Sequence, residues 1–352
     1  MEDEAKQNPL TVVKLLWCGQ GQLGLVEIYN DGKVKAEADF LALINCGGEK
    51  QYAQASLDYV RDKVAARHRK LLNLVVFTRL DPESTSLLGE LGKRLQPIGA
   101  QVMSAFVPGN GGLGRELEAV EDFFTLLGFS LDGVEFASAD QSDYLKSAEP
   151  TWIAEHNGTY FRILTTDNRS SVRATVLVVD NARLGFILPG QLTFPIMQAI
   201  MRIPDLDARL PPDRVLLLPS HSVLESAAAA RLESPPGTDQ EQWEIIEKFA
   251  AAISPAGICV SAGVDNCSGI PAAAVLDVFA ASLRESDERT YVCFGPLESG
   301  DIFGTWQTVT TKKAIRTTLR TFGSQEPTTY GWIHVGYTLR PELTDTERQA
   351  AP

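Results

Sequence analysis

Short apolar segments alternate with segments of mixed polarity along the first half of the chain. Five apolar runs have the length and composition of β-strands: 10–17, 23–29, 40–46, 71–78 and 100–107. Between them, apolar residues recur every three or four positions, which predicts amphipathic helices over 51–68, 84–95 and 115–127. Apart from Asn45, the run 40–46 is continuously apolar, as expected for a strand that is buried on both faces.

A second set of strands and helices begins near residue 150. Asn157-Gly158 is a strong hairpin signal and separates two strand-like runs. Further strands are predicted over 172–180, 184–189, 214–219, 257–263 and 290–295, and helices over 191–203, 240–253 and 271–284. Such alternation is typical of βαβ units.

Both halves therefore run from hairpins into alternating strands and helices. We predict an α/β fold built as a four-layer αββα sandwich, with two sheets face to face and helices outside. The predicted domain spans 10–340, with halves of about 10–150 and 151–340, between flexible tails at 1–9 and 341–352.

The composition is that of a globular protein, with 44% apolar and 22% charged residues. No apolar run approaches the roughly 18 residues that a membrane span needs. The acidic start, MEDEAKQNP, lacks the basic and apolar regions of a secretory signal. The sequence therefore predicts a cytoplasmic protein with no membrane partner.

Acidic residues outnumber basic ones, 45 against 32, which gives a net charge of −13. Nucleic-acid binding relies on Lys and Arg side chains that displace counterions from phosphates. The densest basic cluster runs from Lys312 to Arg320 and is weak by that standard. The acidic balance therefore argues against a nucleic-acid partner.

Three loops of the first half follow predicted strands and carry glycines or charges. Their sequences are Trp17-Cys18-Gly19-Gln20-Gly21-Gln22, Ile44-Asn45-Cys46-Gly47-Gly48 and Thr78-Arg79-Leu80-Asp81-Pro82-Glu83-Ser84. Three loops of the second half also follow strands. They read Pro189-Gly190-Gln191, Pro219-Ser220-His221-Ser222-Val223 and, over 261–271, Ser-Ala-Gly-Val-Asp-Asn-Cys-Ser-Gly-Ile-Pro.

In this order the six loops resemble the motifs of the metallo-β-lactamase fold, most of all those of the competence-protein type of hydrolase domain. There the motifs read Asp-x-Gly-Gln-Gly-Asp, Ile-Asp-x-Gly-Gly, Thr-His-x-His-x-Asp-His, Gly-Asp, Pro-His-His-Gly-Ser and Ser-x-Gly-x-x-Asn-x-x-Gly-His-Pro. The resemblance covers roughly residues 12–300. It implies the αββα sandwich, with the motif loops gathered at a metal site.

The glycines of these motifs are kept, whereas the metal ligands and nearby carboxylates are replaced. The replaced positions hold Trp17, Gln22, Asn45, Arg79, Asp81, Glu83, Ser84, Gln191, Ser220 and Ile270. Only His221 matches a histidine of the motifs, and the chain has just three other histidines. A catalytic zinc usually needs three protein ligands, and Arg79 adds a permanent positive charge in place of one.

The resemblance therefore implies a catalytically inactive member of the fold, with a vestigial site and no metal cofactor. Such a protein would act as a protein-binding, scaffolding or regulatory subunit. Two alternatives remain open. An atypical phosphodiesterase-like hydrolase would bind Mg²⁺ or Mn²⁺, less readily Zn²⁺, through Asp81, Glu83 and His221, with Asp265 as a possible base. A non-catalytic sensor would bind a small ligand in the vestigial cleft.

Arg79 carries the sharpest local prediction. Its guanidinium could replace the charge of the lost metal by pairing with Asp81 and Glu83, which would lower the pKa of both carboxyl groups. His221 and Asp265 also have simpler interpretations, as a structural histidine and as a residue that caps a turn.

Overall fold

The structure is a computed structural model. It describes residues 9–16, 18–19, 21–33, 35–108, 114–136, 153–167, 174–180, 184–190, 192–218, 239–255, 257–260, 275, 278–279, 281–282, 291–295, 305–310, 313–317 and 332–337.

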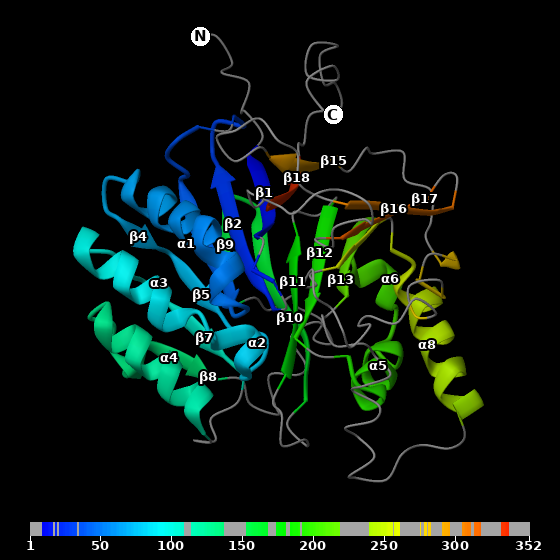
Figure 1. The fold of residues 1–352 in the computed structure, drawn as a ribbon. Helices are drawn as coiled ribbons and strands as arrows, with labels where there is room; N and C mark the ends of the chain where they lie inside the picture. Colours follow the sequence, from blue (N-terminus) through cyan, green and yellow to red (C-terminus); the bar gives the residue numbers. More distant parts are fainter. Residues whose placement is uncertain are drawn as a thin grey trace.

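Two β-sheets, each with eight strands among the described residues, form the centre of the fold (Figure 1). The first sheet has the order β15-β18-β1-β2-β3-β5-β7-β8. Its strands are β1 (Leu10–Leu16), β2 (Leu23–Tyr29), β3 (Phe40–Cys46), β5 (Leu74–Val76), β7 (Ala105–Val107), β8 (Val134–Phe136), β15 (Tyr291–Gly295) and β18 (Trp332–Tyr337). The pairing is antiparallel from β15 to β3 and parallel from β3 to β8.

The second sheet repeats this change of direction. Its order is β16-β17-β14-β13-β12-β11-β10-β9. The strands are β9 (Ala154–His156), β10 (Thr159–Asp167), β11 (Ala174–Asp180), β12 (Leu184–Pro189), β13 (Asp213–Leu218), β14 (Gly257–Val260), β16 (Thr305–Thr310) and β17 (Lys313–Thr317). Pairing is antiparallel from β9 to β12 and parallel from β12 through β13 and β14 to β17.

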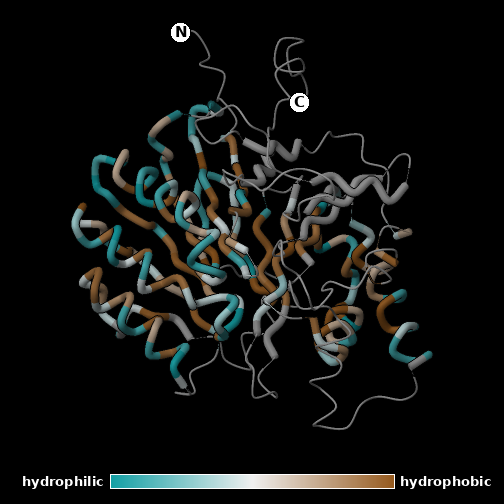
Figure 2. The backbone as a smooth tube through the Cα atoms, viewed as in Figure 1, coloured by the Kyte–Doolittle hydropathy of each residue, from teal (hydrophilic) through white to brown (hydrophobic). Residues whose placement is uncertain are grey.

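Helices cover the outer face of each sheet (Figure 1). The first sheet carries α1 (Lys50–Ala65), α2 (Pro82–Thr85), α3 (Leu88–Leu95) and α4 (Arg115–Leu126), and the second α5 (Phe194–Met201), α6 (Leu206–Arg209) and α8 (Asp239–Ile253). Figure 2 shows that hydrophobic residues concentrate in the strands and that the outer helices mix hydrophobic and hydrophilic residues. Among the described residues, no helix has both the length and the apolar character needed to cross a bilayer.

Three apolar contact layers hold the two sheets and the two layers of helices together. One lies between the first sheet and its helices and includes Leu43, Leu57 and Phe124. The middle layer joins the two sheets, and the third packs the second sheet against α5 and α8. Buried apolar area is the main stabilising contribution in such a fold. The predicted αββα sandwich is therefore confirmed.

Element boundaries were predicted best where the apolar pattern is continuous. The predicted strands 23–29, 40–46 and 184–189 coincide with β2, β3 and β12. The prediction of one strand over 71–78 was wrong, because Asn73 separates β4 (Leu71–Leu72) from β5. The Asn73 side chain accepts hydrogen bonds from Leu41 N at 3.0 Å and from Arg67 at 2.6 Å, so it connects this strand break to its neighbours.

Two further predicted elements are divided in the structure. Residues 84–95 contain the end of α2 and all of α3, and residues 100–107 contain β6 (Gln101–Val102) and β7. Strands β16, β17 and β18 were not predicted as strands. Because β15 and β18 extend the first sheet, its strands come from both ends of the chain.

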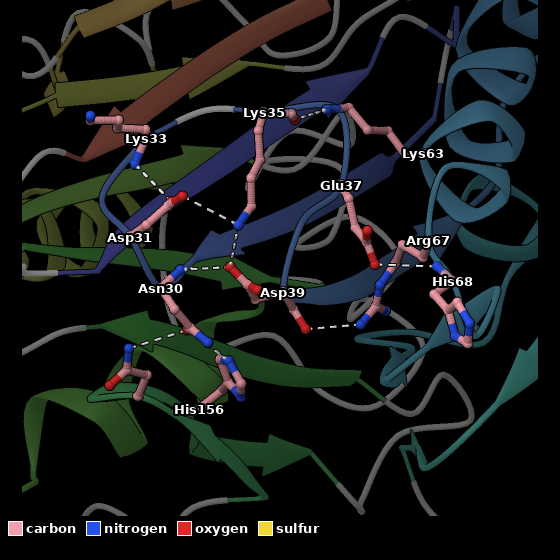
Figure 3. A network of polar contacts seen from close by, with 11 residues as sticks. Asn30, Asp31, Lys33, Lys35, Glu37, Asp39, Lys63, Arg67, His68 and His156 are labelled. Atoms are coloured by element: carbon pink, nitrogen blue, oxygen red, sulfur yellow. Dashed lines mark hydrogen bonds and ion pairs between the residues drawn. The ribbon is translucent and has the colours of Figure 1, made fainter.

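The loop between β2 and β3 connects the two sheets at one edge (Figure 3). Within the loop, Lys35 lies 3.3 Å from Asp39, and Asn30 N donates to the same carboxylate at 2.8 Å. Asn30 Oδ1 lies 3.1 Å from Nε2 of His156 in β9, and the His156 ring stacks on Phe40 with 4.9 Å between centroids. Polar and aromatic contacts thus join a first-sheet hairpin to a second-sheet hairpin.

Candidate functional site

The loops that follow β1, β3 and β5 meet at one edge of the first sheet. Gln22 N donates to the carbonyl oxygen of Glu83 at 2.9 Å, and Gly47 N donates to the carbonyl oxygen of Gln22 at 3.0 Å. Thr175 N, in β11, donates to the carbonyl oxygen of Thr78 at 2.6 Å. Figure 1 shows α2, which follows the loop after β5, at the lower edge where the two sheets meet.

Asn45 connects these loops through its side chain. Its Nδ2 donates to Gln22 Oε1 at 2.8 Å and to Thr78 Oγ1 at 2.7 Å, and its Oδ1 accepts from Thr78 N at 2.8 Å. The residue is buried with a φ of 56°, a left-handed conformation that asparagine adopts more readily than most residues. Neutral amides thus link the loops at two positions where the family has aspartates.

Two glycines allow the loops to approach this closely. A Cβ at Gly47 would lie 2.1 Å from the carbonyl oxygen of Glu83, and a Cβ at Gly190 would lie 2.1 Å from that of Thr78. Both separations are far shorter than a van der Waals contact, so only glycine fits without movement of the loops. Loop packing alone therefore accounts for these two glycines.

Arg79 and Asp81 form an ion pair through Nε and Oδ2. The pair is buried, since Arg79 is 8% exposed and Asp81 is 7% exposed. The second carboxylate oxygen of Asp81 accepts from Ser84 N at 2.9 Å and caps the start of α2. One oxygen of Asp81 thus caps α2 and the other faces the Arg79 guanidinium. The predicted pairing of Arg79 with Asp81 is confirmed.

The predicted direction of the Asp81 pKa is wrong. Burial raises the pKa of Asp81, and the Glu83 carboxylate raises it further, whereas Arg79 and the Ser84 hydrogen bonds lower it only in part. Desolvation disfavours the charged form of a carboxyl group. The prediction from the sequence considered the charge of Arg79 and omitted the desolvation of Asp81.

The described side chains at this edge do not fit a catalytic metal site. Gln22 and Asn45 are neutral amides that bond to one another, and Asp81 is already paired with Arg79. Within the described parts of the chain, no group of three or more His, Cys, Asp or Glu residues is placed to hold a metal. A guanidinium at this point would also repel a divalent cation.

The structure therefore brings together Gln22, Asn45, Arg79, Asp81, Glu83 and Ser84 of the predicted vestigial site. The other candidates lie outside the described residues, namely Trp17, Gln191, Ser220, His221, Asp265 and Ile270. Thr78, to which the sequence analysis gave no role, bonds to Asn45 through both its backbone N and its hydroxyl.

A second polar cluster, which the sequence analysis missed, lies between the first sheet and α1. Lys14 Nζ donates to Glu27 Oε1 at 2.6 Å, and the Tyr59 hydroxyl donates to the same oxygen at 2.7 Å. Tyr29 donates to Glu27 Oε2, and Lys63 Nζ lies 3.3 Å from that oxygen. Lys14 is 1% exposed and Glu27 is fully buried.

Burial changes the acid–base properties of this cluster. It lowers the pKa of Lys14 to about 8, against an ordinary 10.5, and Glu27 offsets the shift only in part. Burial would by itself raise the pKa of Glu27, but the charges of Lys14 and Lys63 outweigh it and the pKa is lowered. Burial also raises the pKa of Tyr59. The fold thus holds one carboxylate among cations and phenols.

Comparisons with known proteins give structural similarity only. No family model and no curated protein matches the chain. Similar solved structures include the metallo-β-lactamase fold protein YhfI from Bacillus subtilis, with 9% identity, a TM-score of 0.38 and coverage of 72% of this chain and 86% of that one.

Two others are a long form RNase Z from yeast (7% identity, TM-score 0.37, 74% of this chain and 38% of that one) and a new diphosphatase from the PhnP family (11%, 0.35, 71% and 85%). The layer order and sheet topology described above carry the structural assignment. On that basis, the described chain is an αββα sandwich, the architecture that the resemblance of its loop motifs implies.

Proposed function

We propose that this protein is a non-hydrolytic αββα sandwich that acts as a protein-binding or scaffolding subunit. The observation that carries the proposal is the buried Arg79–Asp81 pair, which stands in the loop where hydrolases of this fold bind metal. A permanent cation there replaces the charge of a metal ion but cannot activate a water molecule as a metal does.

The neighbouring contacts support this proposal. Asn45 bonds to both Gln22 and Thr78, so its side chain connects the loops. Asp81 caps α2, which also connects the site to the fold. Side chains at this edge thus stabilise the frame, and we infer that the frame serves to present a surface to another protein.

Metal analysis and a hydrolysis assay on the same preparation test the proposal. We expect full-length protein, purified without chelator, to hold no stoichiometric metal and to leave bis(p-nitrophenyl) phosphate intact with added Zn²⁺, Mn²⁺ or Mg²⁺. The alternative hydrolase would bind about one or two ions per chain. Its activity would fall in an Asp81→Asn variant and persist in an Asp62→Asn control on the exposed face of α1. That pattern would replace our proposal with the hydrolase.

A further inference from the structure

Helices α3 and α4 enclose an open groove on the outer face of the first sheet. Its volume is about 540 Å³, and its lining includes Gly89, Ala119, Phe123 and Leu126. Phe123 is buried and forms part of the floor. The lining is thus mainly apolar, with Gln96, Asp122 and Thr125 as its polar members.

Glycines of α3 shape this groove. At Gly92 the helices touch, because a Cβ there would lie 2.7 Å from Leu126 Cδ2. One turn earlier, a Cβ at Gly89 would meet no atom within 4 Å. The groove is therefore open above Gly89, and a side chain at this position could enter it without displacing the helices.

The charges beside the groove are unbalanced. Helix α4 carries four acidic residues, Glu116, Glu118, Glu121 and Asp122, against the single base Arg115. In the described structure, none of the four acids forms an ion pair, and Glu118 and Asp122 are exposed one turn apart. Like charges four residues apart on a helix repel each other.

The acid of α3 differs in this respect. Glu90 lies 2.9 Å from Lys50 and 3.3 Å from Lys93, so its charge is matched within the chain. Only the α4 side of the groove leaves acidic groups without local cations in the described structure. An apolar floor beside unmatched carboxylates is complementary to a helix with one apolar face and one basic face.

We propose that the α3–α4 groove docks a basic amphipathic helix of a partner protein. Apolar side chains of that helix would contact Ala119, Phe123 and Leu126, and its Lys or Arg residues would reach Glu118 and Asp122. This inference rests on the proposed function, because it names the surface through which the chain binds a protein.

The probe for the test is a fluorescent amphipathic peptide of Leu and Lys, about 18 residues long so that it can form a stable helix. We expect saturable binding to the full-length protein by anisotropy. A Gly89→Leu substitution should fill the groove and weaken binding about tenfold or more, whereas Gly89→Ala should change it less than about twofold. Charge removal by Asp122→Asn should weaken binding several-fold, and Asp62→Asn on α1 should leave it unchanged.

Two peptides serve as matched controls. One has the same Leu and Lys residues in scrambled order, and the other replaces Lys by Glu; neither should bind at the groove. Binding of the scrambled peptide with equal affinity would mean general attraction to an acidic protein and would overturn the groove. Equal affinity of wild type and Gly89→Leu, with unchanged melting temperatures, would also overturn it. Neither outcome depends on the metal and hydrolysis measurements, so failure of the groove and failure of the non-hydrolytic function are distinguishable.

Discussion

The buried Lys14–Glu27 cluster makes an unusual prediction about alkaline stability. Burial lowers the pKa of Lys14 to about 8, while the unfolded chain keeps a value near 10.5. Between these two values the unfolded state binds more protons than the folded state. The contribution of Lys14 to stability must then rise with pH over this window, because the free energy of unfolding increases wherever the unfolded state is the more protonated one.

The magnitude follows from the size of the window. Each pH unit contributes about 1.4 kcal/mol for one proton, so the gain from pH 8 to about pH 9.5 is about 1.5 to 2 kcal/mol. Other buried groups oppose this gain. Burial raises the pKa of the Cys46 thiol, whose ionisation favours the unfolded state from about pH 9, and it raises the pKa values of Tyr29 and Tyr59, whose ionisation does so above about pH 10. The useful range is therefore pH 8 to 9.5.

Urea unfolding at several pH values measures this gain. We expect the free energy of unfolding of the wild type, relative to that of a Lys14→Met variant, to rise across the window. Lys50→Met is the matched control, because Lys50 is 65% exposed and should leave the slope unchanged. In Glu27→Gln the partner charge is gone, so Lys14 should lose its proton at a lower pH and the rise should begin below pH 8. Parallel, flat curves for wild type and Lys14→Met would refute the reasoning.

Two further substitutions test the candidate site. Gly47→Ala should lower the free energy of unfolding by about 2 to 4 kcal/mol, because its Cβ would overlap the Glu83 carbonyl. Its control, Gly89→Ala, should be neutral or stabilising. Equal melting temperatures for the two variants would contradict the close loop contact. Arg79→Ala should lower the free energy of unfolding by about 3 kcal/mol near neutral pH, because it leaves Asp81 buried and charged. This loss should shrink as the pH falls and Asp81 binds a proton. An unchanged melting temperature would exclude a stabilising pair.

The fold was predictable where the local pattern alone determines an element. Mostly apolar runs predicted β2, β3 and β12 to the residue. The break at Asn73 was not predictable, because it depends on tertiary bonds of its side chain to Arg67 and to Leu41, a residue of another strand. The same holds for β18, whose place beside β1 depends on pairing across most of the chain.

The polar clusters differ in how far the sequence indicated them. Arg79 and Asp81 were recognised because a motif fixed their place, yet the pKa of Asp81 was misjudged since burial cannot be read from a motif. Lys14 was missed although a signal was present: it alternates with Val12 and Leu16 along one face of an apolar strand. A lysine in that phase is expected to be buried, and Glu27 occupies a similar phase in the next strand.

Retained glycines and lost ligands carry different information about this protein. Gly47 and Gly190 are required by close backbone contacts within the chain. Their presence is therefore explained by the packing of the loops, and it says nothing about hydrolysis. The chemistry depends on the side chains, and there the Arg79–Asp81 pair already uses the carboxylate that a metal would need. An argument for activity must accordingly rest on measured metal binding, whereas an argument for a binding role rests on the surface that this preserved frame presents.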